Sequence, residues 1–152
     1  MEAVIFVGIQ AVGKSTFYKE RFFATHVRIS LDLMRTRHRE RSLLAWRLDH
    51  QQPFVVDNTN VTAAERAVNI APARAAGFRV VGYFFESDVL ASIRRNEGRS
   101  GAARVPPIAA GGTRRRLELP SRTEGFAELF FVRIGDDGRF VVDAWRETIG
   151  DS

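Results

Sequence analysis

The sequence GIQAVGKST, residues 8–16, follows directly on the apolar run AVIFV of residues 3–7. Four residues between its two glycines let backbone N–H groups surround a phosphate, and glycine permits the close approach and positive φ that such a loop requires. A chance glycine-rich turn would lack the short strand before it and the helical pattern after it. The stretch therefore predicts a strand, a nucleotide-binding loop and a helix. The phosphate-binding pattern G-x-x-x-x-G-K-[ST] is matched at Gly8, Gly13, Lys14 and Ser15.

This pattern gives each member of the loop a chemical role. Lys14 is expected to reach the β- and γ-phosphates, and the Ser15 hydroxyl is expected to bind Mg²⁺. The N-terminus of the following helix adds its dipole to the same anion. Apart from Thr16, which is treated below, the residues expected to bind the nucleotide are Gly8, Gln10, Ala11, Val12, Gly13, Lys14 and Ser15.

Length and composition indicate one ordinary globular domain over residues 1–152, with 45% hydrophobic and 27% charged residues. The chain has no cysteine, which excludes disulfides, thiolate metal sites and cysteine nucleophiles. No apolar run approaches the ~20 residues that a membrane span needs. The first residues also lack the cationic start of a signal peptide. We therefore expect a cytoplasmic protein with no membrane partner.

The net charge of +5 comes almost entirely from arginine, since Lys14 and Lys19 are the only lysines among 23 basic residues. Arginine grips phosphate through two hydrogen bonds, which suits a polyanionic substrate. A GC-rich coding sequence would give the same bias. The positions of particular arginines therefore carry more information than their number.

Alternating strand and helix patterns are typical of a parallel sheet covered on both faces. We expect an α/β fold of the P-loop type, with strand order 2-3-1-4-5, helices on both faces and an antiparallel C-terminal hairpin. The hairpin turn is the stretch GDDG at residues 135–138. Strands are expected at residues 3–7, 26–30, 54–57, 79–85, 130–134 and 140–145.

Helix signals fill the gaps between these strands. The first helix should run from the loop to about residue 23, with Phe17, Phe22 and Phe23 as core candidates. A second helix should begin at an Asp32 cap and continue through Leu48. The others are expected from the capping box at Thr62 to Gly77, and over residues 88–96.

Residues 98–112 are rich in glycine and alanine and are interrupted by two prolines. We expect a mobile lid over about residues 95–117, in which residues 113–117 form a helical piece. Arg95 and Arg99 lie four residues apart, and so line up on a helix, where they could stabilise charge on a transferring phosphoryl group. The alternative is a solvated helix end with favourable C-terminal cations.

Ligands of open α/β sheets bind beyond the carboxyl ends of the strands. Asp32 and Arg35 follow the second strand and are three residues apart, which places them on one face of a helix start. The stretch DNTN of residues 57–60 follows the third strand, and Asp57 could hold Mg²⁺ through water. The alternatives are a helix cap with a surface partner in the first case and turn-forming residues in the second.

Together these motifs resemble the polynucleotide 5′-hydroxyl kinases of nucleic-acid repair over most of the chain. The first motif is common to many ATPases and kinases, whereas the linked set is much more specific. The phosphatase motif Asp-x-Asp-Gly-Thr of the bifunctional repair enzymes is absent, so the resemblance implies a kinase alone. The stretches that carry it are GIQAVGKST, RISLDLMR at 28–35, VVDNTN at 55–60, IRRNEGRSG at 93–101, VPP at 105–107 and LELPSRTEGF at 117–126.

The resemblance implies roles for the catalytic residues. Asp32 would be the general base on the acceptor hydroxyl, and Arg35 would contact a phosphate of the acceptor. Lys14, with Arg95 and Arg99, would neutralise the transferring phosphoryl group.

The resemblance also implies the binding residues. Ser15 would bind Mg²⁺, and Thr16 would steady the α-phosphate of ATP. Asp57 and Asn58 would lie beside the metal and the acceptor.

The sequence thus predicts an ATP- and Mg²⁺-dependent kinase acting on a hydroxyl, foremost the 5′-hydroxyl of RNA or DNA. Two alternatives stay open. The first is a kinase for a small acceptor such as a nucleoside, sugar or antibiotic, and the second is a nucleotide-binding switch without phosphotransfer. The acidic Asp32 argues against the switch, and the basic lid favours a phosphorylated acceptor over a neutral sugar.

Overall fold

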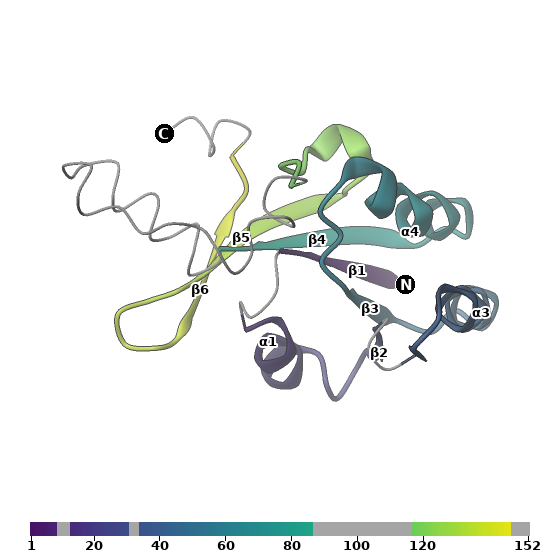
Figure 1. Cartoon of the computed structure of the whole chain (residues 1–152), viewed down its shortest axis with the longest axis horizontal. Coiled ribbons are helices and arrows are strands. Elements are labelled where there is room, and N and C mark those ends of the chain that lie inside the picture. The colour runs from purple at the N-terminus through teal and green to yellow at the C-terminus, as the bar shows by residue number, and fades with distance from the viewer. Residues whose placement is uncertain (9–12, 31–33, 87–116, 147–152) are drawn as a thin grey trace.

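The computed structural model describes residues 1–8, 13–30, 34–86 and 117–146, which Figure 1 draws in colour. The strands are β1 (Glu2–Val7), β2 (Val27–Ile29), β3 (Phe54–Asp57), β4 (Arg79–Phe85), β5 (Glu128–Ile134) and β6 (Phe140–Ala144). The helices are α1 (Lys14–Arg21), α3 (Arg37–Asp49), α4 (Ala63–Ala75) and the short 3-10 helix η2 (Arg122–Glu124).

A six-stranded sheet in the order β2-β3-β1-β4-β5-β6 forms the centre of the molecule. The first five strands in this order pair in parallel, and β6 pairs antiparallel to β5. This confirms the expected order 2-3-1-4-5 and the antiparallel C-terminal hairpin. The hairpin turn closes where the Gly138 N–H donates to the Gly135 carbonyl at 2.9 Å.

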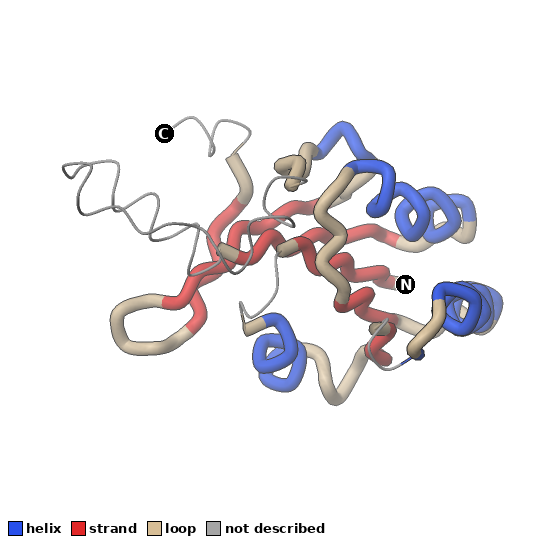
Figure 2. The backbone as a smooth tube through the Cα atoms, in the orientation of Figure 1, coloured by secondary structure: helices blue, strands red, loops and turns tan. Residues whose placement is uncertain are grey.

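Helices cover both faces of the sheet (Figures 1 and 2). On one face, Leu44 of α3 and Ile70 of α4 pack in the same cluster as Ile5 and Val56. On the other face, α1 packs against Phe6 and its neighbours. Residues 3–7 of β1 are fully buried, which explains why this central strand is an unbroken apolar run rather than an alternating one.

The α1 face is an aromatic cluster centred on Phe6. The ring of Phe6 lies 5.9 Å from those of Phe17 and Phe22 and 4.9 Å from that of Phe85. Phe17 and Phe22 are therefore core residues, as predicted. Phe23 is 73% exposed, so its assignment to the core was wrong. The helix ends at Arg21 with Phe22 as its C-cap, and Phe23 lies beyond this cap, in the turn that follows.

The predicted helix from Asp32 through Leu48 is not continuous, because it is interrupted at Arg35. Arg35 has a φ of 70°, a left-handed conformation that does not continue an α-helix. The helix α3 begins after it, where the Thr36 side chain accepts from the Arg39 N–H. Thr36 is therefore the N-cap of α3, and Asp32 lies outside the described residues.

The capping box at the start of α4 is confirmed, with one difference. The Thr62 hydroxyl accepts from the Glu65 N–H at 3.1 Å. The Glu65 carboxylate reaches back to the N–H of Val61, one residue earlier than in the usual box. Gly77, with a φ of 83°, stands just beyond the end of this helix as expected.

The expected helix over residues 88–96, Arg95, Arg99 and the lid up to residue 116 lie outside the described residues. Leu117, the last residue of the expected helical piece, is irregular. In the part of the chain that the structure describes, no helix has the length and apolar character needed to cross a membrane.

Candidate active site

The carboxyl ends of β1, β2 and β3 meet at one edge of the sheet and position the candidate site. The strand register pairs Ile29 with Val56 and Phe6 with Asp57. Beyond the strands, the Gly8 N–H donates to the Thr59 carbonyl at 2.9 Å. The start of the phosphate loop therefore lies directly beside the DNTN stretch, as expected for parallel strands.

The far end of the loop has the conformation that its second glycine was expected to allow. Gly13 has a φ of 82° and is the N-cap of α1, which begins at Lys14. No side chain caps this helix, and the N–H groups of a helical first turn attract an anion. Gln10, Ala11 and Val12 lie outside the described residues, so their contacts with a phosphate stay a prediction.

Lys14 joins the two strand ends. Its ammonium donates to the carbonyl of Gly8 at 2.9 Å and to that of Asn58 at 3.0 Å. The ammonium thus lies between the start of the phosphate loop and the end of β3. This position puts a positive charge where the loop is expected to hold phosphates.

Ser15 and Asp57, the two predicted Mg²⁺ ligands, are linked by Arg28 of β2. One guanidinium nitrogen, Nε, donates to Asp57 Oδ2 at 2.8 Å, and Nη2 donates to Ser15 Oγ at 2.9 Å. The side chain of Asp57 is 4% exposed, and that of Arg28 is 26% exposed. The two predicted ligands therefore lie on either side of one guanidinium group.

Strand register explains why Arg28 reaches both groups. Arg28 pairs with Val55, and Asp57 lies two residues beyond Val55, on the same face of the sheet. Val55 belongs to the α1 face. Arg28, which the sequence analysis did not select as a site residue, could have been noticed as an arginine inside the short apolar strand VRI.

Tyr18 holds α1 beside β2. Its hydroxyl donates to the carbonyl of His26, one residue before β2. Burial raises the pKa of Tyr18 above its ordinary value, so the hydroxyl remains a neutral donor. This contact helps to keep Ser15, at the start of α1, near Arg28.

The donor groups at this edge fit Mg²⁺. A hydroxyl and a carboxylate are hard oxygen ligands, and Mg²⁺ commonly takes only one or two protein ligands together with substrate phosphates and water. Among the described residues there is no group of three or more histidine, aspartate or glutamate side chains that could hold a metal by themselves. A metal here would therefore be shared between the protein and a bound nucleotide.

Asn58 is held in place by a buried acid that the sequence analysis did not select. Its side-chain amide donates to Glu40 Oε2 at 2.8 Å. Glu40 comes from α3, is 4% exposed, and accepts from Arg37 at 3.0 Å through its other oxygen. The only sequence signal for this acid is its place four residues before the buried Leu44.

The acceptor side of the site is described only in part. Asp32 lies outside the described residues. Arg35 is exposed, precedes the first turn of α3 and is not itself helical, so the prediction that it lies in a helix start is wrong. Thr16 is exposed in the first turn of α1. The roles assigned to these three residues stay predictions.

The segment after the expected lid is fastened to the DNTN stretch. Arg66 of α4 is fully buried and donates to the Asn60 carbonyl at 2.8 Å. It also forms two hydrogen bonds, of 2.7 and 3.1 Å, with the carboxylate of Glu124. The Glu118 N–H donates to the Val61 carbonyl at 2.7 Å. This clamp fixes the backbone that follows Asp57 and Asn58.

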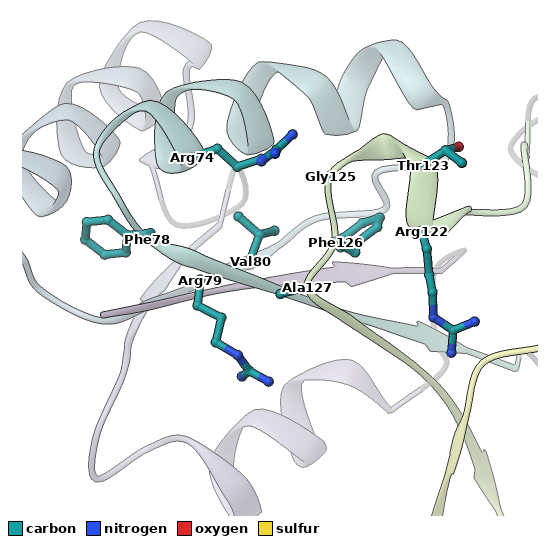
Figure 3. A pocket seen from close by; sticks show the side chains of 9 residues that line it. All are labelled: Arg74, Phe78, Arg79, Val80, Arg122, Thr123, Gly125, Phe126 and Ala127. Atoms are coloured by element: carbon teal, nitrogen blue, oxygen red, sulfur yellow. The ribbon is translucent and has the colours of Figure 1, made fainter.

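A cavity of about 340 Å³ lies at the opposite end of the sheet, where β4 and β5 begin. Figure 3 shows Arg74 lying over Gly125, while Arg79 and Arg122 extend away from it. Arg79 pairs with Glu128 at 2.7 Å and with Glu2 at 3.4 Å. Because its arginines do not converge and the cavity is remote from the phosphate loop, we do not assign it to the site.

The fold and this edge agree with a known family. A family model described as an AAA domain matches residues 4–120. The chain belongs to this AAA-domain family. The match spans the phosphate loop and the carboxyl ends of the first strands, so this AAA domain has the P-loop nucleotide-binding fold predicted from the sequence.

Three solved structures resemble this AAA domain in fold. Kti12 of Chaetomium thermophilum, solved with ADP-AlF3, shares 17% identity, with a TM-score of 0.59 and coverage of 89% of this chain and 90% of that one. The PezAT toxin–antitoxin system of Streptococcus pneumoniae shares 14% identity, with a TM-score of 0.63 and coverage of 92% of this chain and 70% of that one. A gluconokinase from Sinorhizobium meliloti 1021 shares 16% identity, with a TM-score of 0.56 and coverage of 89% of this chain and 83% of that one. At these identities the likeness shows a shared fold and no more.

Proposed function

We propose that this AAA domain is an ATP-dependent kinase for the 5′-hydroxyl of a polynucleotide. The observation that carries the proposal is the grouping of Lys14, Ser15 and Asp57 at one sheet edge, directly beside the strand that leads to Asp32. This grouping supplies a cation for the transferring phosphoryl and ligands for a metal. The ADP-AlF3 bound to Kti12 supports an adenine nucleotide in the loop.

The chain's own residues would divide the work as follows. The Lys14 ammonium would neutralise charge on the β- and γ-phosphates. Ser15 and Asp57 would hold Mg²⁺, which supplies further positive charge for the phosphates. The Asp32 carboxylate would accept the proton of the attacking hydroxyl. Arg95 and Arg99, from the proposed lid of residues 95–117, would stabilise the charge that develops on the phosphoryl group.

A surface on α3 supports a polyanionic acceptor. We call it the α3 basic surface, and its members are Arg35, just before the helix, and the exposed His38, Arg39 and Arg41; the exposed Arg37 is left out because it pairs with Glu40. Cations near a helix N-terminus are unfavourable by about 0.3–1 kcal/mol each. These cations lie at the N-terminal end of α3, which follows β2 and is next to the candidate site, so they oppose the helix dipole there. Departures of this kind are expected where function, rather than stability, selects the residues.

Arg35 connects this surface to the proposed reaction. Its guanidinium could bind a phosphate of the acceptor while Asp32 takes the proton of the 5′-hydroxyl. A nucleoside 3′-monophosphate offers both groups within one nucleotide. The charge-assisted contact contributes about 1.5–3 kcal/mol, or roughly 10- to 100-fold in kcat/KM.

The decisive experiment measures transfer of label from γ-labelled ATP to a set of acceptors. These are a 5′-hydroxyl oligonucleotide, a nucleoside 3′-monophosphate, the bare nucleoside and gluconate. We expect the oligonucleotide and the 3′-monophosphate to exceed the nucleoside by 10- to 100-fold, and Arg35→Ala to remove most of that preference. An enzyme that treats nucleoside and 3′-monophosphate alike does not act on polynucleotides.

The fold likeness to a gluconokinase favours a second candidate, a kinase for a small hydroxyl compound. Labelling of gluconate or the bare nucleoside in preference to the oligonucleotide would support it. Nucleotide binding without label transfer to any acceptor would instead support a switch.

A further inference from the structure

Arg28 holds the two groups that the metal site needs. Its guanidinium donates to Ser15 Oγ and to Asp57 Oδ2 at once. A divalent cation would use the same oxygens, because the hydroxyl and the carboxylate are the ligands of this edge. The arginine thus supplies a positive charge between two groups that also attract a metal. The guanidinium and the cation cannot both bind the Ser15 oxygen at the same time.

The two hydrogen bonds of Arg28 are unequal. The bond to Asp57 joins a cation to a carboxylate whose side chain is 4% exposed, and charge-assisted bonds of this kind are the stronger ones. The bond to Ser15 has a neutral acceptor on an exposed residue. The Ser15 bond should therefore open before the Asp57 bond, and Asp57 is where the guanidinium, 26% exposed, resists the cation most.

We propose that Arg28 competes with the divalent cation for Ser15 and Asp57, so that the metal enters this site together with the nucleotide and not before it. Without nucleotide, the metal must displace a guanidinium that already neutralises Asp57. With nucleotide, the phosphates add negative charge and further oxygen ligands. Before the nucleotide binds, Arg28 acts as a positioning residue that keeps Ser15 and Asp57 together.

Manganese binding to the nucleotide-free protein tests this proposal, with Mn²⁺ as an oxygen-seeking probe followed by electron paramagnetic resonance. Arg28→Met keeps much of the side-chain length and removes the charge. We expect it to bind Mn²⁺ about 10- to 100-fold more tightly than the wild type, the scale of a charge-assisted contact. Adding Asp57→Asn should abolish the gain. Arg133→Met, which alters a partly exposed arginine of β5, is the matched control and should change nothing.

ADP completes the test. In the wild type, ADP should raise the affinity for Mn²⁺ strongly. In Arg28→Met, ADP should raise the affinity for Mn²⁺ by a smaller factor. Equal Mn²⁺ affinities of the folded wild-type and Arg28→Met proteins without nucleotide would overturn the proposal. These measurements need no acceptor, so failure of the kinase assay would leave them standing.

A second variant covers the case in which Arg28→Met does not fold. Arg28→Lys keeps the charge, but a single ammonium cannot reproduce the fork that serves both partners. It should bind Mn²⁺ more tightly than the wild type, and Mn²⁺ alone should raise its melting temperature more than that of the wild type. The proposal would be contradicted if Arg28→Lys matched the wild type both in Mn²⁺ affinity and in the rise of melting temperature with Mn²⁺.

Discussion

Asp32 is the residue on which the proposed chemistry depends most directly. It comes three residues after the end of β2, the strand that carries Arg28, and three residues before Arg35 of the α3 basic surface. The helix α3 is capped by Thr36, so Asp32 is not needed for the cap that the sequence first suggested. The role of its carboxylate stays a prediction.

Asp32→Asn separates chemistry from structure. Asparagine keeps the size and most hydrogen bonds of aspartate but cannot accept the proton. We expect transfer from labelled ATP to fall by roughly 10²–10⁴-fold, the contribution of a positioned base. ADP affinity and the free energy of unfolding in urea should hardly change. A fully active Asp32→Asn protein would show that this carboxylate is not the base.

At the scale of elements, the pair between Arg66 of α4 and Glu124 of η2 fixes the loop after β3. Removing one partner of a buried ion pair costs about 3–5 kcal/mol, because the other charge stays buried without compensation. We expect Arg66→Met to lower the free energy of unfolding in urea by this amount. Arg66→Met combined with Glu124→Gln should be less destabilised than Arg66→Met alone. Equal loss in both would mean that packing, and not charge, is responsible.

The α3 basic surface makes a separate prediction about nucleic-acid binding. Arg39→Gln with Arg41→Gln should weaken binding of a single-stranded oligonucleotide and make it less sensitive to salt. Each lost phosphate contact lowers the slope of log K against log salt by about 0.7. Transfer to a nucleoside 3′-monophosphate should remain, since it needs only Arg35.

The matched control for this experiment is Arg133→Gln with Arg139→Gln, which removes one partly exposed and one exposed arginine from the hairpin. It changes the net charge equally. If the control weakens oligonucleotide binding as much as the α3 variant does, the effect is due to total charge and not to the α3 basic surface.

At the scale of the whole molecule, nucleotide binding joins segments that are far apart in the chain. Lys14 contacts Asn58, and Arg28 contacts both Ser15 and Asp57. A ligand that binds only this folded arrangement stabilises it. At 100 times its Kd, ADP with Mg²⁺ should add about 2.7 kcal/mol, which corresponds to roughly 5–11 °C in Tm for a chain of this size.

Thermal melting with and without ADP checks this prediction. Lys14→Ala should lose most of the shift, because the cation beside the phosphates is gone. The same shift in Lys14→Ala as in the wild type would place the nucleotide elsewhere.

Much of this arrangement follows from local sequence. The loop glycines, the apolar run before them, the capping box at Thr62 and the turn at residues 135–138 each have short-range causes, and the structure has them where the pattern predicted. The position of the candidate site at the carboxyl ends of the strands was also predicted, since parallel strands bring these ends together. The roles of Gln10, Ala11, Val12, Thr16, Asp32, Arg35, Arg95 and Arg99 stay predictions of the sequence.

Only the tertiary structure decided the contacts that join distant segments. Arg28 reaches Asp57 because Arg28 pairs with Val55 across two strands, and Glu40 holds Asn58 across 18 positions of the chain. No local pattern encodes such pairings, because they depend on strand register and helix packing. Arg35 shows the same limit: its left-handed φ interrupts the helix that the sequence predicted, and α3 begins only after the Thr36 cap. Local sequence thus determined the kind of site, and tertiary packing decided which charges surround it.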